Sequence, residues 1–323
     1  MKTSFRLFAG ALCACAAFAA RAADPVGFPP SPPKVSPAAG TIDLHVHSYP
    51  DVFGRSMDDI DVAVLAKNKG MRALLLKNHV TTTADRAALV MKVVPGIDIY
   101  GGIVLNNSVG GINPAAVEWM HRMSGGRGKV VWLPTFDSDK HIKTLVNKNG
   151  SGIQVAPNGV VTPQVEEVLK IIARENLSLA TGHVHAYEVI AVVKRARELG
   201  VKNIIITHGL TNIPGLSMEQ AKQVTQMGAF IEVCFLQTMT GPGAQYEWMT
   251  HWSKVSINDL AGAVKQLGAQ SIIVSTDLGQ QGNMTHPDGM EMAIGSLRKE
   301  GVSQADIEQM VKKNPARFLG LEG

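Results

Sequence analysis

Hydrophobic residues occur along this chain in short runs that are separated by longer amphipathic segments. The runs are rich in β-branched residues, which is typical of buried strands. They predict strands at residues 41–46, 72–76, 97–105, 129–133, 177–180, 203–207, 229–233 and 271–275. Helical sequence follows each of these strands, and eight such units predict a single-domain α/β fold, the (β/α)8 TIM barrel.

Turn-forming residues set the limits of the predicted helices. Helices are expected over residues 57–68 and 113–123, and a further helix starts at Thr162-Pro163, a good cap and first-turn pair. Asn158-Gly159 predicts a small hairpin inserted after the fourth strand. The alternative to a barrel is an open doubly wound sheet, which usually has a glycine-rich turn after its first strand. The sequence DLHVHS at residues 43–48 is not such a turn.

The first 40 residues are predicted to lie outside the barrel. Residues 1–22 combine a basic start, a hydrophobic run too short to span a membrane and an A-x-A-like end, which predicts a secretory signal cleaved before Ala23. A lipoprotein signal around Cys13 is the weaker alternative. Proline-rich residues 23–40 predict a linker, and residues 41–323 the barrel. We therefore expect a periplasmic or secreted protein with no membrane attachment after cleavage.

Cleavage would change both the charge and the cysteine content. Removing Lys2, Arg6 and Arg21 from the 31 basic residues leaves 28 against 27 acidic residues, so the mature chain is almost neutral. It has no basic patch of the kind that binds nucleic acid. Cys234 would be its only cysteine, which excludes a disulfide within the mature chain. We expect a small-molecule substrate, and the sequence leaves a homo-oligomer open.

Histidines are concentrated where the predicted strands end. The six at these positions, of ten in the chain, are His45, His47, His79, His183, His185 and His208. Asp277 follows the eighth strand in the same way. Because the carboxyl ends of barrel strands meet at one rim, these side chains should gather there. Two histidines spaced as in HxH would also suit a hydrogen-bonded pair, but the whole set predicts a divalent metal site, with zinc favoured over manganese or iron.

The order of these residues resembles the amidohydrolase superfamily of metal-dependent barrel hydrolases. The resemblance rests on HxH in the first strand, single histidines ending the fifth and sixth, an aspartate ending the eighth, and the closing sequence NPARFLGL at residues 314–321. It extends from about Thr41 to Leu321. The segments LLLKNH, GGIVLN and STDLGQ are similar to an exported, uncharacterised branch of this superfamily rather than to a subgroup of known substrate.

The resemblance implies a role for each of these residues. His45, His47 and Asp277 would bind one ion, and His183 and His208 a second, if there is one. Asp277 would also act as general base. Many two-metal members have a lysine or glutamate bridge on the fourth strand, but KVVWLPTFD at residues 129–137 offers neither. Lys77, as a carbamate, and Asp137 are the substitutes. Lys77 could equally be a cation that holds an anionic substrate group, so one-metal and two-metal sites both remain open.

Several neighbouring residues have weaker assignments. His79 shares a strand face with Lys77 and is expected in the site as a catalytic residue. His185, Asn106 and Glu232 are candidates for substrate contact or for supporting the ligands, with turn or structural roles as alternatives. Other histidines are expected on the surface (His121, His141 and His251) or at a helix start (His286). The loop Met239–Trp252 is either a lid over an apolar substrate or a loop that simply packs against the rim of the barrel.

These residues predict an exported metal-dependent hydrolase that uses a metal-activated water on an ester, lactone or amide-type substrate. Two alternatives keep the same barrel, a phosphoesterase and a metal-dependent decarboxylase. A third is a barrel that binds a metal or a solute without catalysis. The fold alone does not choose among substrates.

Overall fold

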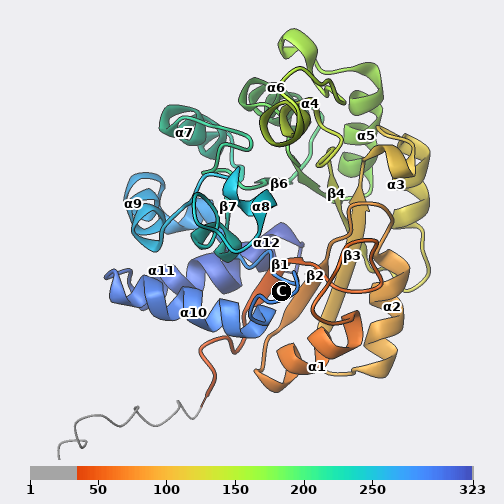
Figure 1. Cartoon of the computed structure of the whole chain (residues 1–323). Coiled ribbons are helices and arrows are strands. Elements are labelled where there is room, and N and C mark those ends of the chain that lie inside the picture. Colours follow the sequence, from red (N-terminus) through yellow and green to blue (C-terminus); the bar gives the residue numbers. More distant parts are fainter. Residues whose placement is uncertain (1–34, 322–323) are drawn as a thin grey trace, which may run out of the picture. The chain divides into compact units, whose positions relative to one another are not determined.

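The computed structural model describes residues 35–321, in which parallel strands alternate with helices (Figure 1). The predicted signal and most of the predicted linker lie outside the described residues. The eight strands pair in sequence order, β1 through β8. Their bounds are Ile42–Val46, Ala73–Leu76, Asp98–Val104, Gly128–Trp132, Ser178–Ala180, Asn203–Ile206, Phe230–Cys234 and Ile272–Ser275. The predicted barrel and all eight predicted strands are confirmed.

The helices of the described residues follow the strands and cover the outside of the sheet (Figure 1). α1 to α6 are Asp59–Asn68, Ala84–Val93, Pro114–His121, Asp139–His141, Pro163–Arg174 and Ala186–Glu198. α7 to α12 are Met218–Gln226, Glu247–Thr250, Ile257–Leu267, His286–Lys299, Gln304–Glu308 and Asn314–Phe318. The predicted caps are confirmed, since Thr162 accepts from Val165 N and Pro163 begins α5.

Hydrophobic side chains form two buried clusters. The smaller one takes residues from all eight strands, for example Leu75, Val130, Phe230 and Ile273, and therefore fills the inside of the barrel. Phe318 of α12 belongs to this inner cluster and is 1 % exposed. The larger cluster lies between the outer face of the sheet and the helices. Both sides of the strands are thus buried, as expected for a parallel sheet.

The barrel closes between β8 and β1 through the residues that follow them. Asp277 N donates to His45 O at 2.9 Å, and His47 N donates to Leu278 O at 3.2 Å. Gly279 has φ 118°, and a Cβ there would collide with the His47 carbonyl oxygen. Only glycine fits this close approach of two backbones. The closing seam therefore carries three of the predicted metal ligands.

The segment inserted after β4 is not the predicted hairpin. It contains α4, a π-helical turn at Ile142–Val146 and a 3-10 turn at Pro157–Gly159. Asn158 and Gly159 do have positive φ, 55° and 78°, as a hairpin turn would require. No strands flank them, however, because Val155 N and Ala156 N donate to the buried Glu188 of α6 instead of to a partner strand.

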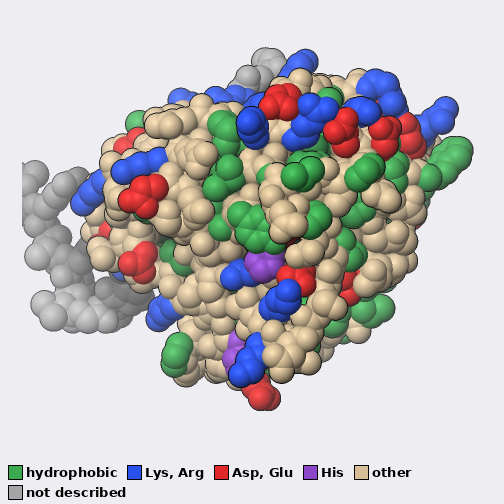
Figure 2. Space-filling view, turned by 90° about the horizontal axis from the view of Figure 1, so that it is seen from above, with side chains coloured by type: hydrophobic (Ala, Val, Ile, Leu, Met, Phe, Trp, Pro, Cys, Tyr) green, Lys and Arg blue, Asp and Glu red, His purple; other side chains and the backbone are tan. Residues whose placement is uncertain are grey.

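None of the described helices combines the length and apolar character needed to cross a membrane. On the face shown in Figure 2, lysines and arginines lie among aspartates and glutamates, in keeping with the nearly balanced charge. The last residues of the predicted linker pack on the barrel, where Ser36 Oγ donates to Glu291 at 2.6 Å and Gly40 N donates to Gly70 O.

Candidate active site

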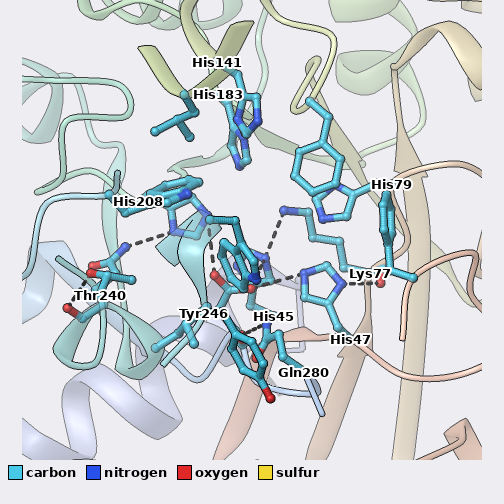
Figure 3. Close-up of a pocket in the computed structure, with 18 of the residues that line it drawn as sticks. His45, His47, Lys77, His79, His141, His183, His208, Thr240, Tyr246 and Gln280 are labelled. Atoms are coloured by element: carbon cyan, nitrogen blue, oxygen red, sulfur yellow. Dashed lines mark hydrogen bonds and ion pairs between the residues drawn. The ribbon is translucent and has the colours of Figure 1, made fainter. Parts of the chain in front are cut away.

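A cavity of about 660 Å³ opens where the strands end (Figure 3). Most of the predicted site residues line it, namely His45, His47, Lys77, His79, His183, His208 and Asp277. The structure therefore brings together side chains that are up to 232 positions apart in the sequence. Asn106, His185 and Glu232 do not line the cavity. Asn106 and Glu232 instead contact histidines that do, His79 and His45.

His45 is held from both ends of its ring. Nδ1 lies 3.2 Å from Glu232 Oε1, and a carboxylate there accepts the Nδ1 proton. Nε2 then has its lone pair free, and it lies 2.9 Å from Lys77 Nζ and 3.1 Å from Asp277 Oδ1. Glu232 thus fixes the tautomer of His45, which is the usual task of a carboxylate behind a metal-binding histidine.

His47 shows the same arrangement with a different partner. Nδ1 lies 3.1 Å from the Lys77 carbonyl oxygen and 3.4 Å from Arg55 Nη2. The shorter contact is to an atom that only accepts, so we assign the proton to Nδ1. The Nε2 lone pair therefore faces Asp277 Oδ1 at 3.2 Å. The lone pairs of His45 Nε2 and His47 Nε2 both face Asp277 Oδ1. Burial raises the pKa of Asp277 to about 8, so this carboxyl keeps a proton in the metal-free protein, and that one proton can serve only one of the two rings. A cation satisfies both lone pairs and the carboxylate, so these residues fit a divalent metal.

The other half of the cavity is formed by the residues after β5 and β6. His208 Nε2 lies 3.7 Å from Asp277 Oδ2, and its Nδ1 contacts the Gln237 amide at 2.9 Å. His183 Nε2 is buried and has no hydrogen-bond partner within residues 35–321. An unpartnered buried nitrogen is costly, and a bound ligand would remove that cost.

Burial lowers the pKa of each of these imidazoles well below its usual value, and nearby cationic groups lower it further. This holds for His45, His47, His79, His183 and His208. The rings are therefore neutral, which is the form that binds metal ions. Burial also raises the pKa of Asp277, an effect that Lys77 partly offsets.

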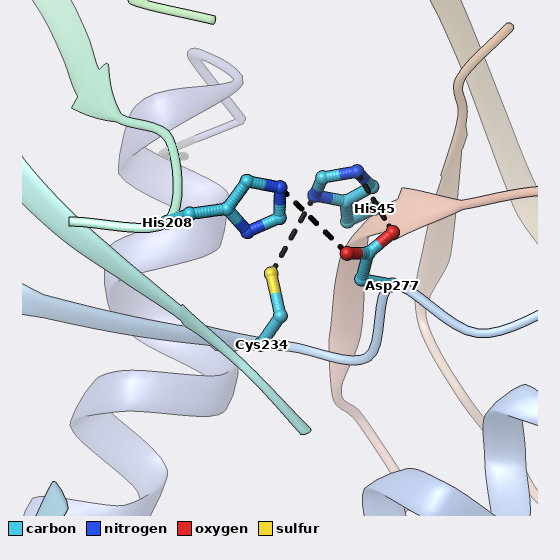
Figure 4. A group of neighbouring side chains, drawn as sticks. All are labelled: His45, His208, Cys234 and Asp277. Carbon is cyan, nitrogen blue, oxygen red and sulfur yellow. Dashed lines mark hydrogen bonds and ion pairs between the residues drawn. The ribbon is translucent and has the colours of Figure 1, made fainter. Parts of the chain in front are cut away.

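Cys234 is a site residue that the sequence analysis missed. It ends β7, is buried, and forms a compact group with His45, His208 and Asp277, whose potential ligand atoms all lie within 4.8 Å of one another (Figure 4). Its Sγ lies 3.6 Å from His45 Nδ1, the nitrogen that faces Glu232 rather than Asp277. The alternation of side chains along a strand could have predicted this position, because Glu232 and Cys234 are two residues apart and therefore lie on the same face of β7.

The two substitutes for a bridging ligand differ in position. The Asp137 carboxylate accepts from Asn107 N at 2.7 Å and does not line the cavity, which argues against a bridge. Lys77 is 1 % exposed, with Nζ 2.9 Å from His45 Nε2 and 5.7 Å from the centre of the Trp132 ring. Burial lowers the pKa of Lys77, while Asp277 and Glu232 oppose this change.

His79 is fixed by a short chain of hydrogen bonds. Its Nδ1 contacts Thr135 Oγ1 at 2.9 Å, and Asn106 Nδ2 donates to both that oxygen and His79 O. Phe136 stacks on the His79 ring with centroids 3.9 Å apart. Asn106 therefore orients a site histidine and does not line the cavity itself.

The remaining histidines near the cavity differ in how well their positions were predicted. His141, expected on the surface, is 8 % exposed and lines the cavity, with Nδ1 2.9 Å from His183 Nδ1. The prediction was wrong because Ser138, the N-cap of α4, donates to His183 O at 2.6 Å and so holds α4 against the segment after β5. His185 caps α6, and its Nε2 contacts Asp139 Oδ2 of α4 at 2.8 Å. His286 begins α10 as predicted and is fully buried.

The mouth of the cavity is apolar. Phe53 lies in the loop after β1, Val146 ends the π-helical turn of the insert and Trp248 lies in α8. All three line the cavity and remain 41 %, 71 % and 46 % exposed. Trp252 meets the rings of His183 and His208 edge-on. The loop Met239–Trp252 thus contributes to the cavity wall. Arg55 also lines the cavity and pairs with Asp51 at 2.7 Å.

Comparisons with known proteins place this chain among barrel proteins. The model of DUF6282, described as a family of unknown function, matches residues 40–232. An organophosphorus hydrolase from Deinococcus radiodurans is 15 % identical, with a TM-score of 0.58 over 87 % of this chain and 92 % of that chain. A structure from the engineering of organophosphate hydrolysis in a weak promiscuous lactonase is 15 % identical, with a TM-score of 0.57 over 87 % and 95 %.

No curated protein matches this sequence. Both similar structures share the barrel fold of this chain over most of its length, so the predicted fold is confirmed. At this level of identity the likeness concerns the fold, and any activity must be argued from the site.

Proposed function

This chain belongs to DUF6282, a family of unknown function, and we propose that it is a metal-dependent hydrolase acting on an ester, lactone or amide-type substrate. One observation carries the proposal. His45 Nε2 and His47 Nε2 point their lone pairs at Asp277 Oδ1 from 3.1 and 3.2 Å, while Glu232 and the Lys77 carbonyl oxygen take the ring protons. Zinc suits two imidazoles and one carboxylate, and manganese or iron are the other candidates.

Each residue of the site would have a defined task. His45, His47 and Asp277 would hold one ion, and His183 and His208 a second one. A bound divalent ion polarises a carbonyl group and lowers the pKa of water. Asp277 Oδ2 is not engaged by His45 or His47 and is the atom placed to accept a proton from the attacking water. Lys77 adds a positive charge that would stabilise a developing oxyanion.

The apolar mouth supports a substrate with a hydrophobic part. Phe53, Trp248 and Trp252 would contact that part and exclude water from the reacting group. Names of the similar structures add organophosphate and lactone compounds to the set that should be assayed. We favour the carbonyl substrates, because the two-metal arrangement that clamps a phosphoryl group usually needs a bridging ligand, which β4 does not supply.

The test compares wild-type protein with a variant that carries both His45→Ala and His47→Ala. We expect zinc, manganese or iron in the wild type, and activity on at least one ester, lactone or amide. The variant should lose both, and its far-ultraviolet circular dichroism should show that it still folds. Under a tenth of an equivalent of metal in the wild type after metal loading would refute the proposal, whatever the assays show.

We further propose that the protein is exported, on the basis of residues 1–22. Expression of the full chain in a bacterium should yield a periplasmic protein whose N-terminus is Ala23. Retention of Met1 in the mature protein would contradict this.

A further inference from the structure

The histidines at the cavity share one mode of attachment. Each of five rings is anchored through Nδ1, and the anchors are Glu232 for His45, the Lys77 carbonyl for His47, Thr135 for His79, Gln237 for His208 and His141 for His183. For His45, His47 and His208, Nε2 lies near Asp277. The anchor of His183 stands apart because it is itself a histidine, and no prediction from sequence gave it a role.

The contact between His141 Nδ1 and His183 Nδ1 at 2.9 Å needs one proton, and either ring can supply it. If His141 supplied it, neutral His183 would carry its other proton on Nε2, as a buried N–H without an acceptor. If His183 supplies it, Nε2 presents a lone pair. Lys77 is among the charged groups that act on His183, and positive charge favours a lone pair over an N–H.

We propose that His141 is a positioning residue that accepts the Nδ1 proton of His183 and so keeps the Nε2 lone pair directed into the cavity. Figure 3 shows the two rings side by side at the edge of the cavity opposite His47. The use of that lone pair for a metal ion rests on the proposed function. The tautomer itself does not, because it follows from the contact of the two rings.

The fold holds the two histidines together by more than this one bond. Ser138 Oγ donates to His183 O at 2.6 Å and accepts from His141 N at 3.1 Å, so a single hydroxyl links both backbones. Asp139, the next residue, contacts His185 Nε2 at 2.8 Å and Lys143 Nζ at 2.9 Å. The insert after β4 is therefore fastened to the segment after β5 at the point where His141 meets His183.

The test reads the tautomer of His183 in metal-free protein by histidine-specific nitrogen-15 NMR. In the wild type we expect the proton on Nδ1. His141→Leu removes the acceptor, and the signal should move toward the Nε2-protonated form. His141→Asn places an amide oxygen near the position of Nδ1 and should keep the wild-type form. His286, whose Nε2 donates to Leu278 O at 2.8 Å, is an internal reference for the other tautomer.

Zinc titration gives a second measurement. His141→Leu should weaken zinc binding at the His183 side by about 10–100-fold, the loss typical when the partner behind a ligand is removed. His141→Asn should stay near the wild type, and so should the control His121→Leu, since His121 pairs with Glu175 away from the cavity.

A wild-type His183 protonated on Nε2 would overturn the proposal without any variant, and so would an unchanged tautomer in His141→Leu. Absence of zinc binding in wild-type protein that shows the expected tautomer would instead refute the proposed function alone.

Discussion

The two halves of the cavity are built in different ways. His45, His47 and Asp277 lie at the seam where β8 closes on β1, so the backbone hydrogen bonds that complete the barrel also place the three side chains. His183 and His208 follow β5 and β6, and among the described residues the side-chain anchor of His183 is His141 of α4 in the insert. The ring nitrogens of His45 and His47 all lie near polar partners, whereas His183 Nε2 has none among the described residues.

This difference suggests a division of tasks. A site made by strand pairing is rigid, because moving a ligand would break the barrel, and it suits the ion that must be held most firmly. A site fixed through an inserted segment can differ among related chains without loss of the fold. Both halves have one residue in the left-handed region, His208 at φ 53° and Asp277 at φ 56°, as is common where function requires a constrained backbone.

The largest effect at the seam should come from Asp277→Asn. Asparagine tolerates the positive φ and keeps the shape. Its amide, however, would donate to the lone pairs of His45 and His47, and it cannot accept a proton. We expect turnover to fall by roughly 100-fold or more, the scale of losing a general base, with weaker metal binding. Steady-state kinetics and metal analysis measure both.

A matched control for this change is Asp85→Asn, on an exposed position of α2. It should leave turnover and metal content unchanged. Normal turnover in Asp277→Asn would assign the base to another group of the cavity, with Glu232 and His79 next in line.

An intermediate effect is expected from Lys77→Met, which removes the amine that faces His45 Nε2 at 2.9 Å. If Lys77 is an ammonium, its charge opposes a cation at the seam, and the variant should bind zinc more tightly, by roughly tenfold or more. It should also lose affinity for anionic substrates. If Lys77 is a carbamate bridge, metal binding should instead fall. Isothermal titration with zinc distinguishes the two cases, and Lys222→Met on exposed α7 is the control.

Rescue experiments sharpen the same question. Lys77→Ala should regain metal and activity with added bicarbonate or acetate if the side chain is a carbamate. We expect no rescue, because the structure directs the Lys77 amine at a histidine lone pair.

The half of the cavity at the β8–β1 seam could be predicted from the sequence, whereas the half around His183 and His208 could be predicted only in part. Strand periodicity fixes which residues end each strand, and this was enough to place His45, His47 and Asp277 at one rim. The same rule also implied that Glu232 and Cys234 share a face, but only contacts show that Glu232 anchors His45.

Residues outside the predicted strands and helices escaped prediction. His141 lies in α4 of the insert, a helix of three residues in which no period tells which way a side chain points, and Arg55 lies in the loop after β1. The Asn158-Gly159 pair kept its expected backbone angles without forming a hairpin. Local turn chemistry is set by two residues, whereas a hairpin also needs flanking strands, and here buried Glu188 takes their hydrogen bonds.

Asp43 provides the finest test of the seam, since it ties both strands together. Its Oδ1 accepts from Thr276 N at 2.9 Å and from His45 N at 3.2 Å, and its Oδ2 accepts from the Thr276 hydroxyl. The side chain is fully buried, and burial raises the pKa of Asp43 from 3.8 to about 7. It is therefore a structural carboxyl whose protonation is linked to folding.

The smallest effect we predict is that of Asp43→Asn on stability, and its sign depends on pH. Because the pKa of Asp43 is higher in the folded state, unfolding releases a proton between pH 3.8 and about 7, so the wild type loses stability as pH rises through this window. Asparagine cannot ionise. The variant should be less stable than the wild type by about 1–2 kcal/mol near pH 5, where it loses only part of the hydrogen bonding, and this deficit should shrink toward pH 8. Urea unfolding of metal-free protein at the two pH values measures it, and a deficit that grows with pH would show that Asp43 is ionised in the folded barrel.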